Sequence, residues 1–437
     1  MSGLNFLNKL LDGVDVEWLS LGELGDFIRG NGLQKKDFVE SGFPAIHYGQ
    51  IYTRYGLSAD KTFTYVLPEL ANKLRKAQKN DLLLATTSEN DEDVVKPLAW
   101  LGDNVAISGD MMLFRHEQNV KYLAYFFQSE IFQTQKMKYI TGAKVRRVSS
   151  GDLSKIKIPI PCSNNPEKSL AIQSEIVRIL DKFTALTAEL TAELTAELNM
   201  RKKQYNYYRD QLLSFDEEQE KPIYLEKLLD GVEVEWRTLG EIAVIYDGTH
   251  KTPKYTASGV PFVSVQNIKN LYGTNKYISP EDFKTYKNKP RKHDLFMTRI
   301  GDVGTCAIVE DDRPLAYYVT LALIRINQQI AVPGFIRYLI ESRFGKAELY
   351  KRTLIHAVPM KINLGEIGKV AVPIPCPDNP EKSLAIQSEI VRILDKFDTL
   401  TNSITEGLPR EIELRQKQYE YYRDLLFSFP KPETVSN

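Results

Sequence analysis

A turn-rich run in the second half of the chain, YDGTHKTPKYTASG from Tyr246 to Gly259, concentrates short polar and cationic side chains directly after an apolar strand. Hydroxyl, imidazole and ammonium groups on a loop can meet phosphates and base edges when the loop enters a DNA groove. The residues of this kind are Thr249, His250, Lys251, Thr252, Lys254 and Tyr255. The alternative is a merely exposed loop, and His250 taken alone is more often a structural residue.

A second group of candidates precedes an apolar run that occurs twice in the chain. The segment ITGAKVRRVSSGDLSKIKIPIP aligns with IHAVPMKINLGEIGKVAVPIP, and the alignment pairs Arg147 with Lys361. Lys144, Arg146 and Arg147 form a compact basic group suited to phosphate or guanine contacts. An ordinary solvated turn is the alternative for each of them.

The first half of the chain offers a third group, in the segment HYGQIYTRYG. Gln50 can hydrogen-bond adenine, and so can its counterpart Asn267 in the second half. Tyr52 and Arg54 follow Gln50, beside apolar framework positions. Arg299, in FMTRIGD, is a weaker candidate, and pairing with a local carboxylate is its alternative role.

Motifs of nucleic-acid enzymes are missing from the sequence. It has no G-x-x-x-x-G-K-[ST] phosphate loop, no Asn/Asp-Pro-Pro-aromatic run and no E-x-K triplet. Its three cysteines form no C-x-x-C pair, and its five histidines are scattered. We therefore expect a reader of DNA without catalytic apparatus, metal site or cofactor of its own.

The composition is that of a globular protein whose charge is segregated along the chain. The 437 residues are 43% hydrophobic and 26% charged, so we expect two or three domains. No apolar run is long enough to span a bilayer, and MSGLNFLNKLLDG lacks the plan of a signal peptide. We therefore expect no membrane association and a cytoplasmic location. Residues 19–160 carry a net charge of +3, residues 237–374 carry +8, and the remainder carries −11. Two basic segments on an acidic scaffold predict two nucleic-acid-binding units. Ordinary surface variation is the alternative.

The chain consists of two tandem copies of one plan. NPEKSLAIQSEIVRILDKF occurs at Asn165 and, unchanged, at Asn379, and RKKQYNYYRDQLLSF from Arg201 is repeated as RQKQYEYYRDLLFSF from Arg415. FLNKLLDGVDVEW near the start is echoed by YLEKLLDGVEVEW. The segments between the repeats are more loosely related and contain short β-rich runs such as DLLLATT and DLFMTRI, with helices near KYLAYFFQSEIF and GFIRYLIESRF. Each is expected to be an α+β domain with a substantial sheet.

The repeated segments are expected to be helices. An Asn-Pro pair begins each one, and apolar residues then follow at 3,4 spacing, which is typical of a coiled-coil seam. The two stripes are Ile172, Ile176, Ile179, Phe183, Leu186 and Leu190, and Ile386, Ile390, Ile393, Phe397, Leu400 and Ile404. GLP at Gly407 should bend or break the second helix. The first helix, over about 167–213, would be roughly 70 Å long, and antiparallel packing against the second would place one globular domain at each end.

The first helix contains the letters TAEL three times, at Thr187, Thr191 and Thr195. Ala, Glu and Leu are strong helix formers, so the repeat continues the helix rather than acting as a flexible linker. We expect TAEL to set the distance between the two readers. The competing interpretation is a tolerant stretch of coiled coil.

Two variable segments, each followed by a helix that opens PIPC-x-x-NPEKSLAIQSEIVRILDKF and closes QYNYYRD or QYEYYRD, resemble the DNA specificity subunit of type I restriction-modification enzymes. The TAEL copies are similar to those of the subgroup usually called IC. The resemblance implies an α+β chain with two β-rich target-recognition domains, joined and separated by two long helices that form an antiparallel coiled coil in a pseudo-twofold tandem repeat. The implied domains are an N-terminal segment (1–18), the first target-recognition domain (19–157), a central helical region (158–236), the second target-recognition domain (237–371) and a C-terminal helical region (372–437).

The resemblance also implies partners. Each target-recognition domain would read one half of a bipartite, asymmetric site in double-stranded DNA, and the helices would bind two modification (methyltransferase) subunits. S-adenosylmethionine chemistry would then belong to the modification subunits, and ATP- and magnesium-dependent translocation and cleavage to restriction subunits. The repeated clusters YNYYRD and YEYYRD fit two equivalent subunit-binding surfaces, with packing in the coiled coil as the alternative. The clusters span Tyr205 to Tyr208 and Tyr419 to Tyr422, and the candidates are Tyr205, Tyr208, Tyr419 and Tyr422.

Two rival functions remain open at this point. One is a stand-alone DNA-modifying enzyme with unrecognised motifs, which turnover of a labelled methyl donor would reveal. The other is a coiled-coil scaffold without DNA affinity, against which stands the charge of the two globular segments. Salt-dependent DNA binding separates the scaffold from the reader, because contacts to phosphates weaken as salt rises.

Overall fold

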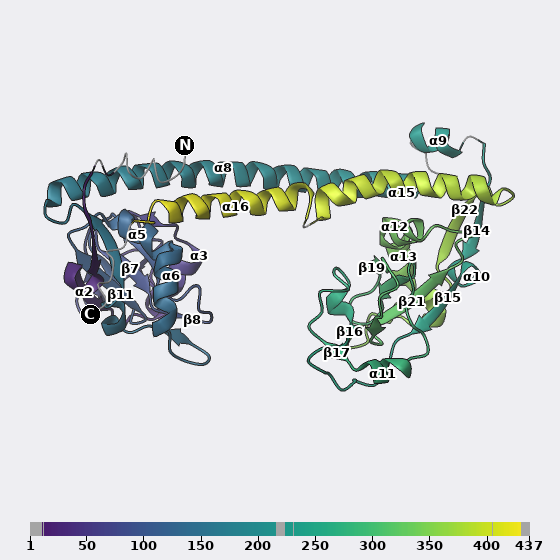
Figure 1. The fold of residues 1–437 in the computed structure, drawn as a ribbon, viewed down its shortest axis with the longest axis horizontal. Helices are drawn as coiled ribbons and strands as arrows, with labels where there is room; N and C mark the ends of the chain where they lie inside the picture. The colour runs from purple at the N-terminus through teal and green to yellow at the C-terminus, as the bar shows by residue number, and fades with distance from the viewer. Residues whose placement is uncertain (1–10, 12, 216–222, 230, 404, 430–437) are drawn as a thin grey trace. The chain divides into compact units, whose positions relative to one another are not determined.

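The computed structural model describes residues 11, 13–215, 223–229, 231–403 and 405–429 (Figure 1). They form two compact units. The first unit comprises Met1–Glu193 together with Ile412–Asn437, and the second comprises Leu194–Glu411. Among the described helices, none is both long and apolar enough to cross a membrane.

The first unit contains a five-stranded sheet in the order β2-β11-β7-β9-β4 and a four-stranded sheet in the order β5-β3-β10-β6, with the two-stranded ribbons β1·β13 and β8·β12. Its strands are β1 (Val16–Ser20), β2 (Gly25–Arg29), β3 (Phe43–Ile46), β4 (Ser58–Ala59), β5 (Thr64–Val66), β6 (Lys76–Ala77), β7 (Leu82–Ala85), β8 (Thr87–Ser88), β9 (Lys96–Trp100), β10 (Val105–Ile107), β11 (Met111–His116), β12 (Arg146–Arg147) and β13 (Lys157–Pro161). Its helices are α2 (Leu21–Leu24), α3 (Tyr48–Thr53), α4 (Pro68–Ala71), α5 (Val120–Gln128), α6 (Glu130–Lys136) and α7 (Ser150–Leu153), with the first part of α8 (Pro166–Leu212) and most of α16 (Gly407–Leu425).

The second unit contains a four-stranded sheet in the order β15-β21-β18-β19, a three-stranded sheet in the order β17-β16-β20 and the ribbon β14·β22. Its strands are β14 (Val234–Thr238), β15 (Ala243–Asp247), β16 (Val260–Val263), β17 (Tyr277–Ile278), β18 (Leu295–Thr298), β19 (Cys306–Ile308), β20 (Ala316–Tyr317), β21 (Leu321–Ile326) and β22 (Ala371–Pro375). Its helices are α9 (Ile223–Leu229), α10 (Leu239–Ile242), α11 (Pro280–Lys284), α12 (Pro333–Glu341), α13 (Arg343–Arg352), α14 (Leu364–Ile367) and α15 (Pro380–Asn402), with the last part of α8.

The two units share a framework, which confirms the predicted tandem α+β repeat. The antiparallel run β2-β11-β7 of the first unit corresponds to β15-β21-β18 of the second. In both units a buried aspartate accepts two hydrogen bonds from an arginine on the central strand. The pairs are Asp81 with Arg115 and Asp294 with Arg325, and the shortest nitrogen-to-oxygen distance is 2.7 Å in each.

The predicted domain boundaries fall within paired strands. β1 pairs with β13 and β14 pairs with β22, so residues on both sides of each boundary belong to one ribbon. The echo that begins at Phe6 lies outside the described residues as far as residue 10, and the same holds for Ile404 in the second apolar stripe.

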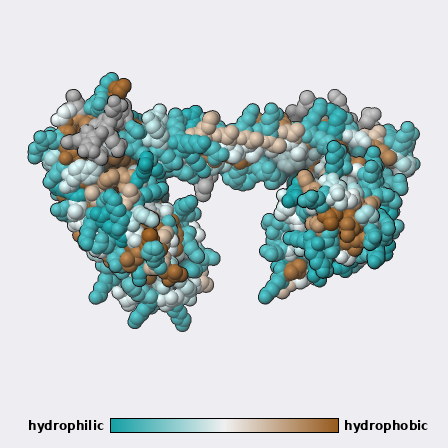
Figure 2. Space-filling model, turned by 180° about the vertical axis from the view of Figure 1, so that it is seen from behind, coloured by the Kyte–Doolittle hydropathy of each residue, from teal (hydrophilic) through white to brown (hydrophobic). Residues whose placement is uncertain are grey.

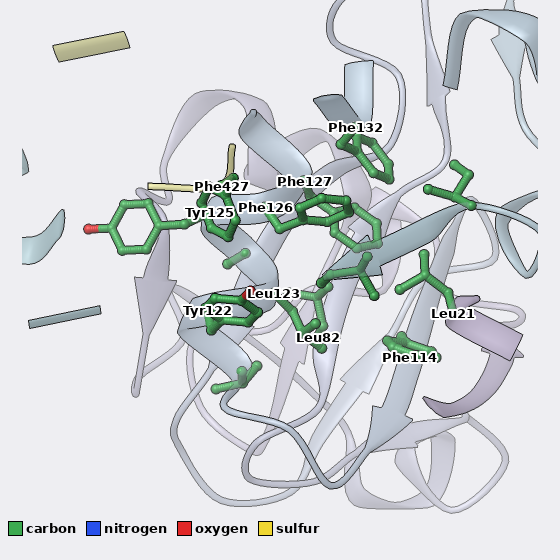
Figure 3. Packing of buried hydrophobic residues seen from close by; sticks show 14 of the residues in the cluster. Leu21, Leu82, Phe114, Tyr122, Leu123, Tyr125, Phe126, Phe127, Phe132 and Phe427 are labelled. Atoms are coloured by element: carbon green, nitrogen blue, oxygen red, sulfur yellow. The ribbon is translucent and has the colours of Figure 1, made fainter. Parts of the chain in front are cut away.

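The core of the first unit is completed by the end of the chain (Figure 3). Phe427 packs on Tyr122 and Phe126 of α5, with ring centroids 5.2 and 5.7 Å apart. α5 in turn packs against β7 and β9, and the Tyr125 hydroxyl donates to Asp181 of α8 at 2.8 Å. In the second unit the matching place is taken by Phe215, whose ring lies 6.0 Å from Phe335 of α12. Each globular core is thus closed by residues that follow the helix of the other repeat.

Both long helices begin as predicted, and the second is broken as predicted. The Asn165 side chain accepts a hydrogen bond from the Lys168 N–H at 3.1 Å, and the Asn379 side chain accepts one from the Lys382 N–H at 3.0 Å. These caps satisfy N–H groups that have no partner within the helix. α8 is a single helix of 47 residues, whereas α15 ends at Asn402 and α16 begins at Gly407, where φ is +77°.

α8 and α16 run antiparallel where they meet in the first unit. The rings of Phe183 and Tyr422 stack at 5.3 Å, and the hydroxyls of Thr184 and Tyr419 lie 3.2 Å apart. An increase in residue number on α8 therefore corresponds to a decrease on α16. In the second unit, Tyr208 of α8 stacks on Phe397 of α15 at 5.4 Å.

The start of the predicted coiled-coil seam has a different role in the structure. Ile172 and Ile176 belong to the hydrophobic core of the first unit, and Ile386 and Ile390 belong to that of the second. These residues face the globular domain because α5 and α12 offer large apolar side chains there. Farther along, Leu186 is 51% exposed. The apolar stripe is therefore a docking face for the reader domain at its start.

Candidate nucleic-acid interface

A hairpin of the first unit presents Arg147 and Lys144 to solvent. It is closed by two hydrogen bonds of 2.9 Å between Thr141 and Arg147, each N–H donating to the other residue's carbonyl. Arg147 also pairs with Thr87 in the ribbon β8·β12. The Arg147 side chain is exposed and has no hydrogen-bond or ion-pair partner among the described residues. The backbone is fixed while the guanidinium is free to bind a ligand.

Arg146, beside it, is engaged within the protein. Its guanidinium forms an ion pair of 2.8 Å with Asp91 and donates to the Gly142 carbonyl at 2.5 Å. Both side chains of the ion pair are about one-third exposed, at 34% and 35%. Arg146 therefore ties the hairpin to the loop that carries Asp91.

Tyr52 is hydrogen-bonded to both ends of the loop that carries Asp91. Its hydroxyl lies 3.1, 3.0 and 3.3 Å from the carbonyl oxygens of Ala85, Thr87 and Asp93. Burial raises the pKa of this phenol well above its usual value, so it stays a neutral donor. Tyr52, Arg146 and Arg147 thus converge on residues 87–93, although only Arg147 is free.

Gln50 and Asn267 are both used for capping. The Gln50 Oε1 accepts from the His47 N–H at 2.9 Å, and the Asn267 Oδ1 accepts from the Ser264 N–H at 3.2 Å. Gln50 Nε2 also donates to Thr64 at 3.2 Å. Both side chains thus support the local backbone, and reading of adenine by either amide stays a prediction.

Arg54 is exposed on the C-cap of α3, where its guanidinium lies 5.7 Å from the centre of the Phe63 ring. No hydrogen bond or ion pair joins it to the Arg147 hairpin within the described part of the unit. Arg54 is therefore a candidate apart from the hairpin.

Arg299 of the second unit is buried and paired with a carboxylate. Its side chain is 8% exposed, its Nη1 donates to Asp247 at 2.6 Å, and its Nε donates to the Ile362 carbonyl at 3.2 Å. The other oxygen of Asp247 lies 2.9 Å from Nε2 of His250. Arg299 therefore has the alternative role given in the sequence analysis, that of pairing with a carboxylate. Through Asp247 it positions the loop that carries His250.

Lys361 is an exposed cation of the second unit. It pairs through its backbone with Ile300, and with Leu354 across a hairpin. Ile300 extends β18 as Thr87 extends β7, so Lys361 and Arg147 occupy equivalent positions, as their alignment predicted. The Lys361 ammonium has no partner among the residues that the structure describes.

The loop after β15 is anchored at its base. The Thr249 N–H donates to the Tyr317 carbonyl at 3.2 Å, and the Thr249 carbonyl accepts from the Val319 N–H at 3.0 Å. Lys251 and Lys254 are exposed beyond it. Asp247, which stands in the run YDGTH but was not among the candidates, therefore joins His250 and Arg299, and Lys361 pairs through its backbone with Ile300, the residue after Arg299.

The tyrosine clusters differ from expectation in which ring faces solvent. Tyr205 is 7% exposed, Tyr419 contacts Thr184, and Tyr208 and Tyr422 stack on phenylalanines. The middle tyrosines are the most exposed of each cluster, at 61% for Tyr207 and 63% for Tyr421, and Tyr208 is also exposed, at 40%. Residues spaced i, i+2 and i+3 span more than half of a helix, and the sequence alone did not tell which of them faces the partner helix.

The fold and these surfaces define a chain with two related readers, each with an exposed cation in the same place, supported on long helices. A family model described as "Type I restriction modification DNA specificity domain" matches residues 13–200 and again residues 231–414. The chain belongs to this family. It is a non-catalytic DNA specificity subunit of the type I restriction-modification class, as its resemblance implied.

Individual relatives agree. The chain is 40% identical to the type I restriction enzyme EcoR124I/EcoR124II specificity subunit from Escherichia coli, with 100% of both chains covered. It is 34% identical to the EcoprrI specificity subunit from the same species, with 93% of each chain covered. A solved structure, from work on complex assembly and conformational transition of the type I R-M system, has a similar fold, with a TM-score of 0.61, 15% identity, and 94% of this chain and 97% of that chain covered.

Proposed function

We propose that each unit reads one half of a bipartite, asymmetric site in double-stranded DNA. The observation that carries the proposal is the equivalence of Arg147 and Lys361, two free cations held at the same place on frameworks whose other loops differ. A shared framework fixes how each reader meets the phosphates, and different loops allow each reader to select different bases.

Selection of bound sequences from random DNA tests this proposal. The chain is used together with its modification partner, and the bound sequences are determined. We expect two half-sites of different sequence, separated by a fixed number of unspecified base pairs. A single continuous site, or a palindrome, would contradict two independent readers.

We further propose that the repeated tyrosine surfaces bind two copies of one modification subunit. Tyr207 and Tyr421 contact the next tyrosine in nearly the same way, with ring centroids 5.5 and 5.4 Å apart. The acid two residues beyond each cluster accepts from a backbone N–H at 2.9 Å in both units, Asp210 from Arg343 and Asp424 from Glu130. A surface that occurs twice in the same form suits two identical partners, and exposed tyrosine is a frequent interface anchor.

Alanine substitution of the exposed tyrosines tests the partner surfaces. Tyr207→Ala and Tyr421→Ala should each reduce the bound modification subunits from two to one, and the double variant should bind none, as measured by the mass of the complex in solution. Leu186→Ala, at another exposed position of α8, is the control and should leave two subunits bound. Two bound subunits in the double variant would refute the assignment.

The proposal leaves the chemistry to the partners. We expect S-adenosylmethionine to be used by the modification subunits, and ATP and magnesium by restriction subunits, all in the cytoplasm. The purified chain should then transfer no label from a methyl donor to DNA and should not cut DNA in the presence of magnesium. Turnover by the chain alone would favour a stand-alone enzyme instead.

A further inference from the structure

The second unit carries a hairpin with an apolar tip. Residues 354–361 are closed by a hydrogen bond of 2.8 Å from the Leu354 N–H to the Lys361 carbonyl. The hairpin is fixed to the Arg299 segment, because the Gly301 N–H donates to the Met360 carbonyl at 2.9 Å and the Ile362 N–H donates to the Arg299 carbonyl at 3.0 Å. Its base is therefore part of the candidate interface.

The apolar side chains at the tip are unusually exposed to solvent. Val358 is 101% exposed, and it is flanked by Leu354 at 48%, Ile355 at 40% and Met360 at 37%. Single exposed apolar residues are common on proteins, but a contiguous group of them usually marks a binding site. Figure 2 shows that hydrophobic patches interrupt the hydrophilic surface of both units; the tip is one contiguous group that the exposed fractions identify.

The charge around the tip indicates what it binds. From Leu349 to Gly365 the sequence contains no Asp or Glu, and Lys361, at the base of the hairpin, has no partner among the described residues. A cation beside an apolar tip is complementary to a DNA groove, where phosphates line the edge and one base carries an apolar group. That group is the 5-methyl of thymine in the major groove.

The first unit has a hairpin in the same place with different chemistry. Residues 141–147 are closed between Thr141 and Arg147, and their tip contains Lys144 and Val145, the latter 45% exposed. The hairpin position is therefore shared between the readers, whereas the apolar tip belongs to the second reader alone. Such a difference is expected of an element that selects bases.

We propose that the 354–361 hairpin enters the major groove of the second half-site and that Val358 contacts the 5-methyl group of a thymine. This inference rests on the proposed function and adds a specificity-determining residue to it. It requires no movement of the framework, because Val358 is already exposed and the base of the hairpin is held by backbone hydrogen bonds.

The test replaces one thymine at a time in the second half-site by deoxyuridine, which lacks only the methyl group. The complex of the full chain with its modification partner is compared with the complex that contains Val358→Ala. We expect one position at which deoxyuridine weakens binding of the unaltered complex by about fourfold, in line with the loss of one buried methyl group. The same replacement should have little effect on the Val358→Ala complex, because the contact is already lost.

Two controls isolate the contact. Val145→Ala, in the hairpin of the first unit, should not change the response to deoxyuridine in the second half-site. Thermal unfolding of Val358→Ala should match that of the unaltered chain, since the side chain packs on nothing that the substitution removes. Equal deoxyuridine responses in the Val358→Ala and unaltered complexes would overturn the inference.

The remaining outcomes are also distinguishable. Loss of modification subunits from the Val358→Ala complex in the absence of DNA would mean that the tip binds protein, and would overturn the inference. If the unaltered complex selects no second half-site, the proposed function itself fails. If the half-site is selected and the Val358→Ala complex selects the same bases with the same affinity, only the inference on the hairpin fails.

Discussion

Arg147 and Lys361 occupy equivalent positions in the two readers. Each is an exposed cation whose backbone pairs with the extension of a sheet strand, Thr87 in one unit and Ile300 in the other. Each also closes a hairpin, with Thr141 in the first unit and with Leu354 in the second. The two residues that the sequence alignment matched therefore occupy equivalent positions in the two folds.

Arg147→Ala and Lys361→Ala should each weaken DNA binding by about 1 kcal/mol or more, because each removes a free cation from the interface. If the contact is to a phosphate, the slope of log affinity against log salt should fall by about 1 for each substitution. Binding is measured over a series of salt concentrations with the assembled complex.

Lys155→Ala and Lys369→Ala are matched controls. They also occupy equivalent positions in the two repeats, but Lys155 pairs with Asp152 at 2.8 Å and Lys369 pairs with Glu366 at 2.6 Å. Their removal should change affinity less. If affinity and salt slope were unaltered in both the Arg147 and Lys361 variants, neither residue would belong to the interface.

Exchange of residues 19–157 for the equivalent segment of a relative should change one half-site only. The exchanged segment contains the five-stranded and four-stranded sheets of the first reader, whereas the second reader keeps every residue of its sheets. Sequences bound by the exchanged chain are selected from random DNA. A change in both halves would show that the readers are not independent.

Asp247→Asn should destabilise the second unit by about 3 kcal/mol, because it leaves the buried Arg299 guanidinium without its carboxylate. It should also weaken binding to the second half-site, since Asp247 holds His250 and Arg299 together. Chemical unfolding and binding to each half-site are the measurements. Asp311→Asn, which breaks the exposed pair with Arg313, is the control and should alter unfolding little.

His116 should make the first unit less stable against unfolding at acid pH. Burial lowers its pKa from 6.5 to about 4, and its Nε2 is buried without a hydrogen-bond partner in the described structure. A lowered pKa means that the unfolded chain binds the proton first, so the loss of stability begins near pH 6.5, grows as the pH falls and levels off below about 4. The loss at pH 4 should approach about 3 kcal/mol.

His116→Ile is the matched variant, because β11 ends at His116 and the corresponding strand β21 ends at Ile326. Unfolding of the two chains is compared at pH 7.5 and pH 4.5. The variant should lose less stability on acidification. An identical loss in both chains would mean that other groups carry the pH dependence.

Deletion of Thr195–Leu198, one TAEL copy, should shorten the DNA spacer by one base pair and leave both half-sites unaltered. α8 is one continuous helix across this sequence, so the deletion shortens it by about 6 Å and rotates the remainder of the helix by about 40°. B-DNA rises about 3.4 Å per base pair, so the change equals between one and two pairs, or fewer if the helix lies oblique to the DNA.

Sites selected by the deletion variant decide between the interpretations of TAEL. An unchanged spacer would mean that the helix merely tolerates the repeat. Altered half-site bases would mean that α8 also shapes the readers. The variant should fold, since four residues approximate one helical turn and keep the leucine stripe nearly in register.

The sequence alone determined the features that depend on local order. Repeats, periodicity and capping chemistry act within a few residues of the chain. They predict the tandem copies, the helix caps at Asn165 and Asn379, the break near Gly407 and the β-rich readers. The equivalence of Arg147 and Lys361 was predicted in the same way, because the repeat fixes their alignment.

Tertiary structure decided what each side chain faces. The isoleucine stripe at Ile172 docks on a reader domain rather than on a second helix, and Phe427 closes the first core. Tyr207 is left more exposed than Tyr208. Arg299 is buried against Asp247, which ends a strand 52 residues earlier. Apolar spacing shows that a helix has a buried face, but its partner is whichever surface loses the most apolar area to water, and that surface is assembled only when distant segments meet.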